Sequence, residues 1–389
     1  MNLDKKMKPT VIAVLVLLLF VGGVDEVPVT TASGDQGWPV IYNSVVVWHD
    51  ERDGNYDIYG YNFSTNQEFQ ITNDPSIQWY PAIYGDTVIW VDLRNYSWDI
   101  YGYNLSTHEE FRITTDPGDK FFPAIYGDIL VWMDERNGNW DIYGYNLSTN
   151  QEFQITTDEH DQCTPAIYGN SVVWHDKRNG NWDIYGYNLS TRKEFPITTQ
   201  GGDQNLPAIY KNIVVWEDSR NSRQDVYGYN LSISEEFQIA IDARYPAIYE
   251  DIVVWVDDRN RNFDIYGLNL STREEFQITV DESSQVWPAI YDNIVVWEDE
   301  RNGNWDIYGC SISPAPTIEF LSLVLYMVPI VIAIVITALA VWIRKRRKES
   351  RMITCPQCGN KIEENWDICP YCGASMDDTL IYDDDTQPY

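Results

Sequence analysis

Four cysteines in the C-terminal part of the sequence have the spacing of metal ligands. Cys355 and Cys358 form one Cys-x-x-Cys pair, and Cys369 and Cys372 form a second pair after ten intervening residues. Four thiolates arranged in this way are a ligand set for tetrahedral zinc. Because four protein ligands leave no open coordination position, we expect the zinc to be structural.

The segment that carries these cysteines, residues 352–375, resembles a minimal zinc-ribbon. A glycine follows each pair, at Gly359 and Gly373, where it lets backbone amides approach the sulfur atoms. So short a segment has no adequate hydrophobic core, and we therefore expect it to need metal to fold. The acidic residues 376–389 beyond it are predicted to be disordered.

Carboxylates and arginines recur along most of the sequence in a fixed pattern. The first copy contains Asp50, Arg52 and Asp57, and the same three types return at each repeat. Such carboxylates could bind calcium, but the bidentate glutamate of an EF-hand is missing and an arginine lies among the acids. We therefore favour structural ion pairs that join neighbouring repeats, with calcium as the alternative.

Catalytic side chains lack a recognisable arrangement. The four histidines, at positions 49, 108, 160 and 175, have no spacing typical of a catalytic triad or a metal site. The Ser-x-Asp-x-Gly-x-Thr-Trp motif typical of sialidases is also absent. We therefore predict a protein that is not an enzyme.

Six repeated sequons could carry N-linked glycans. The Asn-x-Ser motif occurs at Asn62, Asn104, Asn146, Asn188, Asn230 and Asn269. The motif alone is weak, and Asn and Ser also stabilise turns through their side chains. Both roles are compatible, so a glycoprotein is one prediction and turn formation is the other.

Aromatic residues that vary between repeats are the candidate ligand-binding groups. They immediately precede a repeated proline, and the candidates are Trp38, Trp79, Tyr80, Phe121, Phe122, Tyr245 and Trp287. Nearby connectors hold the acids Asp74, Asp116, Asp119, Asp158, Asp161, Asp242 and Asp281. These aromatic rings could stack on sugar rings, or they could fill the interfaces between repeats.

The elements that position these groups follow from an internal repeat. Three motifs, Pro-x-Ile-Tyr, Trp-x-Asp-x-Arg and Asp-Ile/Val-Tyr-Gly, each occur seven times at a step of 42 residues, except for one step of 39 in the connector between Ile239 and Pro246. Each unit predicts four strands: a short one starting at the proline, an apolar one, an alternating one, and an outer Glu-Phe-x-Ile-Thr strand. Four strands in about 42 residues are typical of a β-propeller blade.

The first and last parts of the repeat region complement each other. The seventh unit lacks its outer strand, whereas Val27–Thr31 matches that strand and lies 12 residues before Pro39. An unpaired strand edge would otherwise be exposed. The sequence therefore predicts an all-β fold, a seven-bladed β-propeller over residues 24–313 closed by its N-terminal strand.

The motif Val-Val-Trp-x-Asp-x-Arg-Asn-Gly-Asn-x-Asp-Ile-Tyr, followed by Asn-Leu-Ser-Thr, resembles the TolB-like propeller repeats of archaeal and bacterial cell-surface proteins. The resemblance covers residues 27–310 and implies a surface propeller. TolB itself is six-bladed and carries Ser-Pro-Asp-Gly turns that are absent here, so its partners are not transferred.

Flanking segments predict a membrane topology. Residues 1–23 have the basic and apolar parts of a signal peptide, and because no clear small-x-small cleavage site follows, an uncleaved anchor is the alternative. A linker, residues 314–319, leads to the uncharged apolar stretch 320–343, which as a helix of about 36 Å would span a membrane. The basic stop-transfer segment 344–351 places the C-terminus in the cytoplasm and the propeller outside.

The propeller region is strongly acidic. Between Val24 and Thr317 there are 48 acidic and 17 basic residues. This charge disfavours nucleic acid and anionic lipid as partners, and it favours cations and basic partners.

From these features we expect a single-pass cell-surface protein with a binding or adhesion function, whose partner is an extracellular protein or a carbohydrate polymer. The alternative is a receptor that signals to a cytoplasmic protein through the zinc-ribbon. A carbohydrate-active enzyme is less favoured.

Overall fold

The computed structural model describes residues 26–312, Thr337 and residues 352–376. The chain divides into two compact units, residues 1–313 and 314–389. The predicted signal peptide, linker, stop-transfer segment and acidic tail lie outside the described residues, except for Met376, as does the predicted transmembrane stretch apart from Thr337. Among the described residues, no helix is long and apolar enough to cross a membrane.

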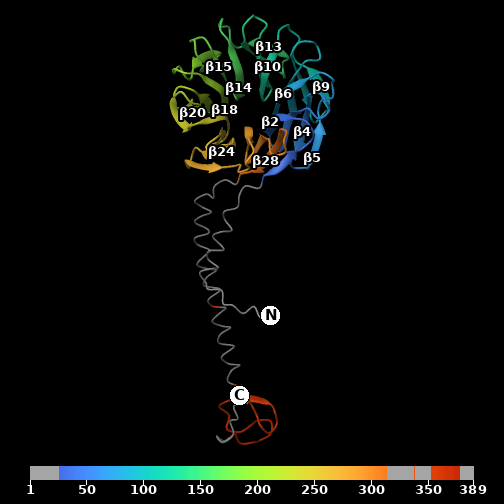
Figure 1. Cartoon of the computed structure of the whole chain (residues 1–389), viewed down its shortest axis with the longest axis vertical. Coiled ribbons are helices and arrows are strands. Elements are labelled where there is room, and N and C mark those ends of the chain that lie inside the picture. The colour runs from blue at the N-terminus through green and yellow to red at the C-terminus, as the bar shows by residue number, and fades with distance from the viewer. Residues whose placement is uncertain (1–25, 313–336, 338–351, 377–389) are drawn as a thin grey trace. The chain divides into compact units, whose positions relative to one another are not determined.

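The first unit is a ring of seven four-stranded antiparallel sheets, the blades (Figure 1). The innermost strands run through Gln36–Tyr42 (β2), Gln78–Tyr84 (β6), Lys120–Tyr126 (β10), Gln162–Tyr168 (β14), Gln204–Tyr210 (β18), Ala243–Tyr249 (β22) and Gln285–Tyr291 (β26). The second strands are Val45–Asp50 (β3), Thr87–Asp92 (β7), Ile129–Asp134 (β11), Ser171–Asp176 (β15), Ile213–Asp218 (β19), Ile252–Asp257 (β23) and Ile294–Asp299 (β27).

The third strands are Asp57–Asn62 (β4), Asp99–Asn104 (β8), Asp141–Asn146 (β12), Asp183–Asn188 (β16), Asp225–Asn230 (β20), Asp264–Asn269 (β24) and Asp306–Ser311 (β28). The outer strands are Gln67–Gln70 (β5), Glu109–Arg112 (β9), Gln151–Gln154 (β13), Lys193–Pro196 (β17), Glu235–Ala240 (β21), Glu274–Gln277 (β25) and Val27–Thr30 (β1). Each innermost strand contacts the next one, and β2 contacts β26, which closes the ring.

The N-terminal strand completes the seventh blade, which confirms the predicted closure. β1 pairs antiparallel with β28, with Val27 opposite Gly309 and Thr30 opposite Ile307. Val29 is 6% exposed and packs with Trp48 and Ile307 in one core cluster. The outer edge of blade 7 is therefore paired in the same way as in the other blades.

Packing inside the blades follows from residue size. The tryptophan of the second strand is fully buried in every blade, and its indole nitrogen donates to the aspartate two residues later, as from Trp132 to Asp134 (2.9 Å). In blades 1 to 6 the glycine of the third strand lies under the phenylalanine of the outer strand. A β-carbon at Gly144 would come within 2.6 Å of the Phe153 ring. Glycine is therefore required there by close packing.

The innermost strands differ from the prediction, because they begin three residues before the proline. The register shifts between Gly37 and Val40, which marks a β-bulge, and Trp38 has a positive φ of 54°. The bulge interrupts the ladder, so Pro39 can lie inside the strand although it has no N–H group. The equivalent residue has a positive φ in all seven blades.

The shortened repeat is accommodated in the connector between blades 5 and 6. β21 runs to Ala240 and β22 begins at Ala243, so only residues 241 and 242 connect them. The amide of Asp242 donates to Asp225 (3.1 Å) and anchors this short connector. The deletion therefore leaves the blade framework intact, as the sequence predicted.

The second unit has one described hairpin, Met352–Thr354 (β29) paired with Lys361–Glu363 (β30). Its small buried core consists of Cys355, Ile362 and Cys369.

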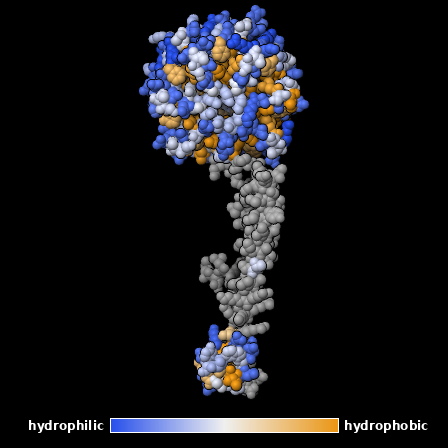
Figure 2. Space-filling model, turned by 180° about the vertical axis from the view of Figure 1, so that it is seen from behind, coloured by the Kyte–Doolittle hydropathy of each residue, from blue (hydrophilic) through white to orange (hydrophobic). Residues whose placement is uncertain are grey.

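On the propeller, hydrophilic residues occupy much of the face shown in Figure 2, with hydrophobic residues among them.

Candidate functional site

Each innermost strand places two chemically distinct positions along the central axis. In β2, Trp38 lies near the start and Tyr42 at the end, and both are half-buried. Four residues of strand separate such positions by about 13 Å. The propeller therefore carries one layer of side chains near each end of the axis.

The layer at the start of the innermost strands, here the aromatic layer, consists of Trp38, Tyr80, Phe122, Tyr245 and Trp287. Trp38 contacts Tyr80 (ring centroids 5.0 Å apart), Phe122 (5.6 Å) and Trp287 (4.6 Å). Tyr245 stacks on Trp287 at 4.0 Å. The contact with Phe122 joins blade 1 to blade 3, so these rings gather across the axis.

A second set, here the aromatic belt, extends from this layer over blades 1 to 3 and consists of Tyr56, Trp79, Trp98, Phe121 and Trp140. Trp79 and Trp98 are stacked at 5.2 Å with an angle of 10° between their planes. Phe121 contacts Trp98 (5.4 Å) and Trp140 (5.9 Å). All five side chains are half-buried.

All seven aromatic residues predicted from the sequence lie in this connected network, because Tyr80 touches both Trp79 (6.1 Å) and Phe121 (6.3 Å). The sequence reasoning missed Tyr56, Trp98 and Trp140. They directly precede the repeated Asp-Ile-Tyr-Gly motif, where six of the seven blades have an aromatic residue. The ligand-binding candidates were chosen among positions that vary between blades, so this repeated position was not considered.

The network is asymmetric, because blades 4 and 5 contribute Thr164 and Leu206 where the other blades have aromatic rings. There the strand bulge is held by a polar side chain: His175 Nδ1 accepts from the amide of Leu206 (3.3 Å). Burial lowers the pKa of His175 to about 3, so this histidine stays neutral. It supports the strand and does not join a catalytic set.

Two glutamates have the same supporting role: Glu217, which is buried, and Glu298, which is half-buried. Glu298 accepts from the amide of Trp38 (2.7 Å) and Glu217 from the amide of Tyr245 (2.6 Å). Burial raises the pKa of Glu298 to about 7. Both carboxyl groups therefore hold aromatic-layer residues from the neighbouring blade.

The connector acids, which the sequence placed beside the aromatic rings, mainly stabilise the connectors. Asp119 accepts from the amide of Trp98 (3.2 Å) and Asp161 from that of Trp140 (3.1 Å). The other predicted acids accept turn amides at Asp74, Asp158 and Asp281, or lie near arginines at Asp116 and Asp242. Asp116 and Asp242 nevertheless keep more than half of their side chains exposed.

The repeated arginine joins two carboxylates of its own blade. Arg136 contacts Asp134 (2.7 Å) and Glu152 (2.5 Å), and its guanidinium lies over the Tyr143 ring at 4.1 Å. The ion pairs expected between neighbouring repeats therefore lie chiefly within a blade. Longer contacts reach the preceding connector from Arg136 to Asp116 (3.4 Å), from Arg94 to Asp74 (3.9 Å) and from Arg301 to Asp281 (3.9 Å).

The second repeated aspartate lies at the seam between blades. The hydroxyl of Thr72 lies 3.1 Å from Asp57 and 3.0 Å from Gln78 of the next blade. Burial is the main cause that raises the pKa of Asp57 to about 6, and the negative charge of Asp53 contributes to the same shift. Polar side chains thus bridge the two blades at this seam.

The sequon asparagines form turns. Oδ1 of Asn104 accepts from the amides of Ser106 and Thr107, both at 2.9 Å. The Ser106 hydroxyl donates to Asp86 in the neighbouring turn. The turn role is confirmed, and glycosylation stays a prediction.

The four predicted zinc ligands are brought together. The Sγ atoms of Cys355 and Cys372 are 3.7 Å apart, those of Cys358 and Cys369 are 3.6 Å apart, and all four lie within 4.8 Å of one another. Zn–S bonds of about 2.3 Å in a tetrahedron require about this separation. Among the described residues, no other group of three or more His, Cys, Asp or Glu has such a geometry.

The local backbone geometry also supports a zinc site formed by the four cysteines. The amide of Gly359 donates to the carbonyl of Cys355 (2.9 Å) and that of Gly373 to Cys369 (2.9 Å), and both glycines have positive φ. Two equivalent turns therefore present the thiol pairs. The residues fit a structural zinc ion.

Comparisons with known proteins agree with the division of the chain into a propeller and a zinc-ribbon. A zinc-ribbon domain family matches residues 354–376. No curated protein matches the chain. Several solved structures share the propeller fold at low sequence identity.

Oligogalacturonate lyase from Vibrio parahaemolyticus has a TM-score of 0.57 at 14% identity, covering 75% of this chain and 94% of its own. The propeller domain of the Trilobed protease from Pyrococcus furiosus, which has an open velcro topology, has a TM-score of 0.55 at 14% identity, covering 72% and 94%. TolB from Acinetobacter baumannii has a TM-score of 0.50 at 18% identity, and the match spans 66% of each chain.

The fold is therefore a TolB-like seven-bladed β-propeller, here with its seventh blade completed by β1. The same chain carries a C-terminal zinc-ribbon with a four-cysteine cluster. A lyase and TolB both occur among the structural neighbours, so the fold alone does not define an activity.

Proposed function

We propose that this protein is a non-enzymatic binding module of the cell surface whose aromatic layer and aromatic belt bind a carbohydrate polymer. One observation carries the proposal: ten aromatic side chains from blades 6, 7, 1, 2 and 3 form one connected network of half-buried rings. Flat apolar rings with partly exposed faces suit stacking against sugar rings. The length of the belt suits an extended chain better than a single small molecule.

Electrostatics narrow the class of polymer. The propeller region has 31 more acidic than basic residues, and a field of that sign opposes a polyanion. A neutral or basic glycan is therefore the ligand of choice. The galacturonate named for the lyase neighbours is anionic and is not transferred to this chain.

Support for a binding role over catalysis comes from the polar groups near the rings. Glu298, Glu217 and His175 each hold a backbone amide of the next blade. The connector acids Asp119 and Asp161 are engaged in the same way. What remains near the rings is a stacking surface.

The repeat supplies a matched pair of variants for the test. Trp98 belongs to the aromatic belt, whereas Trp182 has the same position in blade 4 and packs on His175 (4.6 Å) outside the network. The full-length chain would be applied to a glycan array as wild type, Trp98→Ala and Trp182→Ala. We expect Trp98→Ala to lose binding to a neutral or basic glycan and Trp182→Ala to keep it.

Removing Trp38 or Trp287 should also weaken binding, since both rings hold the aromatic layer together. Equal binding by wild type and Trp98→Ala would contradict the proposal. Binding that depends on an anionic glycan would contradict the choice of polymer.

A further inference from the structure

The opposite end of the central axis carries a closed ring of tyrosines. The tyrosine ring consists of the last residues of the innermost strands: Tyr42, Tyr84, Tyr126, Tyr168, Tyr210, Tyr249 and Tyr291. Each member contacts both neighbours, with all seven centroid distances between 4.5 and 4.9 Å. No member of this set was singled out by the sequence analysis, because its positions do not vary between blades.

Behind the tyrosine ring the axis is lined by small side chains. The residue two positions earlier is alanine in six blades and Val40 in the first, and none of the seven is fully buried. Further along, the aromatic layer crosses the axis, as the contact between Trp38 and Phe122 shows. The side chains behind the tyrosine ring are therefore small and apolar, and the rings of the aromatic layer follow further along the axis.

The phenols of the ring stay neutral and retain acceptor capacity. Burial and the neighbouring tyrosines raise the pKa of Tyr84 and of Tyr291 to about 12. A neutral hydroxyl that donates one hydrogen bond keeps lone pairs free. Together, seven oxygens and seven π faces form a partially negative annulus without a formal charge.

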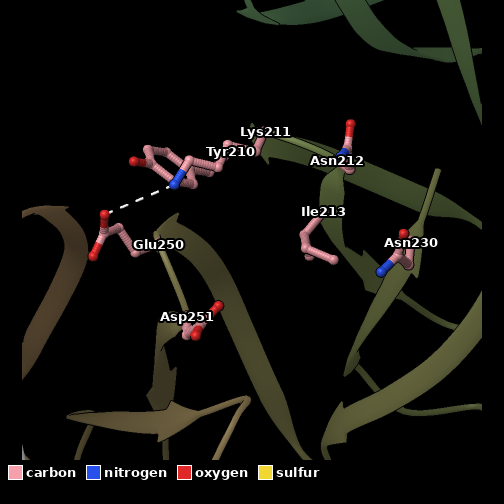
Figure 3. Close-up of a pocket in the computed structure, with 7 residues that line it drawn as sticks. All are labelled: Tyr210, Lys211, Asn212, Ile213, Asn230, Glu250 and Asp251. Carbon is pink, nitrogen blue, oxygen red and sulfur yellow. Dashed lines mark ion pairs between the residues drawn. The ribbon is translucent and has the colours of Figure 1, made fainter. Parts of the chain in front are cut away.

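A cation of the protein already occupies the rim of this annulus. Lys211 Nζ lies 5.0 Å from the centroid of the Tyr210 ring and 3.8 Å from Glu250. These groups line a pocket of about 220 Å³ with Asp251 and Asn230 (Figure 3). Both members of the ion pair are more than half exposed, so the lysine is free to move aside.

We propose that the tyrosine ring is a binding site for a slender alkylammonium group, with its cationic head at the phenol oxygens and ring faces and its alkyl chain against the alanine-lined axis. Aromatic cages recognise ammonium groups through the ring quadrupole. The acidic field of the propeller and Glu250 at the rim raise the local concentration of such cations. This inference is independent of the glycan site, which lies at the other end of the axis.

The test titrates n-butylammonium chloride into the full-length chain at constant ionic strength and follows the tyrosine signals by NMR. The neutral analogue N-butylacetamide and potassium chloride serve as matched probes. We expect saturable binding of butylammonium and no saturation with either control. Saturation by the neutral analogue at similar concentration, or no saturation by butylammonium, would overturn the proposal.

Variants separate the ring from general charge. Tyr126→Leu should weaken butylammonium binding about two- to fivefold, whereas Tyr126→Phe, which keeps the π face, should retain most of it. Tyr103→Leu, a half-buried tyrosine outside the ring, is the control. Equal losses in Tyr126→Leu and Tyr103→Leu would contradict the assignment.

Folding is checked by thermal melting, and the exposed Glu250→Gln variant tests the rim without disturbing the core. It should weaken binding, and unchanged binding would exclude a role for the rim. Titration with spermidine, and with a peptide carrying either lysine or acetyl-lysine, then distinguishes a free amine from a protein side chain as the source of the alkylammonium group.

Discussion

Glu26 and Arg301 form an ion pair of 2.6 Å between the two ends of the propeller sequence. In the other six blades the equivalent arginine pairs with a glutamate of the outer strand, at positions 68, 110, 152, 194, 236 and 275. Glu26 takes that place because β1 acts as the outer strand of blade 7. Ring closure thus reproduces the repeat at the level of single side chains.

Closure by β1 predicts a sharp difference between two valines of that strand, Val27 and Val29. Val29 is 6% exposed, whereas Val27 is 44% exposed. Val29→Asp would bury an unpaired charge and should lower the free energy of unfolding by roughly 3 kcal/mol. Val27→Asp should change it little. Urea unfolding of both variants measures the difference, and similar values for the two would mean that β1 is not docked.

The fold was accessible from the sequence because the repeat makes each residue type appear seven times in one environment. The three repeated motifs, the apolar second strand and the matching of Val27–Thr31 to the open blade all carried a local signal. The start of the innermost strands was missed because a proline normally marks a strand edge, and the bulge that admits Pro39 depends on positive φ at Trp38, which no sequence pattern announces.

The glycine in the third strand supplies a second prediction. A β-carbon at Gly144 would lie 2.6 Å from Phe153, while at Gly309, in the blade closed by β1, the nearest atom would be a Val296 methyl group at 3.1 Å. Gly144→Ala should therefore destabilise the propeller by about 1–3 kcal/mol, as overpacking usually does. Gly309→Ala should cost less. Thermal unfolding of the two variants tests the order, and a larger loss for Gly309→Ala would refute it.

The candidate sites were predictable to different degrees. The zinc ligands followed from spacing alone, because Cys355 to Cys372 lie close in sequence. The aromatic candidates followed from their variation, but their mutual contacts depend on how seven blades meet at the axis. The tyrosine ring was missed because its positions do not vary between blades, and because no residue within one repeat shows that Tyr42 and Tyr291 will touch.

Glu298 predicts a dependence of stability on pH. Its pKa is about 7 in the folded protein against an ordinary value of 4.5. Between these values the unfolded chain has lost the proton that the folded protein keeps, so this group reduces stability as pH rises from about 4.5 to 7. Glu298→Gln keeps an oxygen for the Trp38 amide and removes this loss.

We expect Glu298→Gln to melt at a higher temperature than wild type at pH 8 and at nearly the same temperature at pH 4. Glu300→Gln, in the exposed turn that follows, is the control and should melt like wild type at both values. If the stabilisation by Glu298→Gln were equal at both pH values, titration of Glu298 would not be its cause.

Calcium should leave the propeller unchanged. The carboxylate of Asp134 is bonded to Arg136 and Trp132, and Asp141 accepts from Asn137 and Thr156. Since donors already occupy these oxygens, calcium would have to displace them. Melting curves with and without millimolar calcium should coincide, and a rise in melting temperature that is absent with magnesium would establish a calcium site.

Zinc should be needed by the C-terminal unit alone. Its described core contains Cys355, Ile362 and Cys369, too little apolar surface to hold a fold without the metal. We expect one zinc per chain by metal analysis, and we expect Cys369→Ser to lose it together with the dispersed NMR signals of residues 352–376. Cys163→Ser removes a propeller cysteine and should retain the zinc.

The melting transition of the propeller should be the same in the wild type and in Cys369→Ser, because the two compact units have separate cores. Dispersed signals that survive the removal of zinc would show that the ribbon folds without metal.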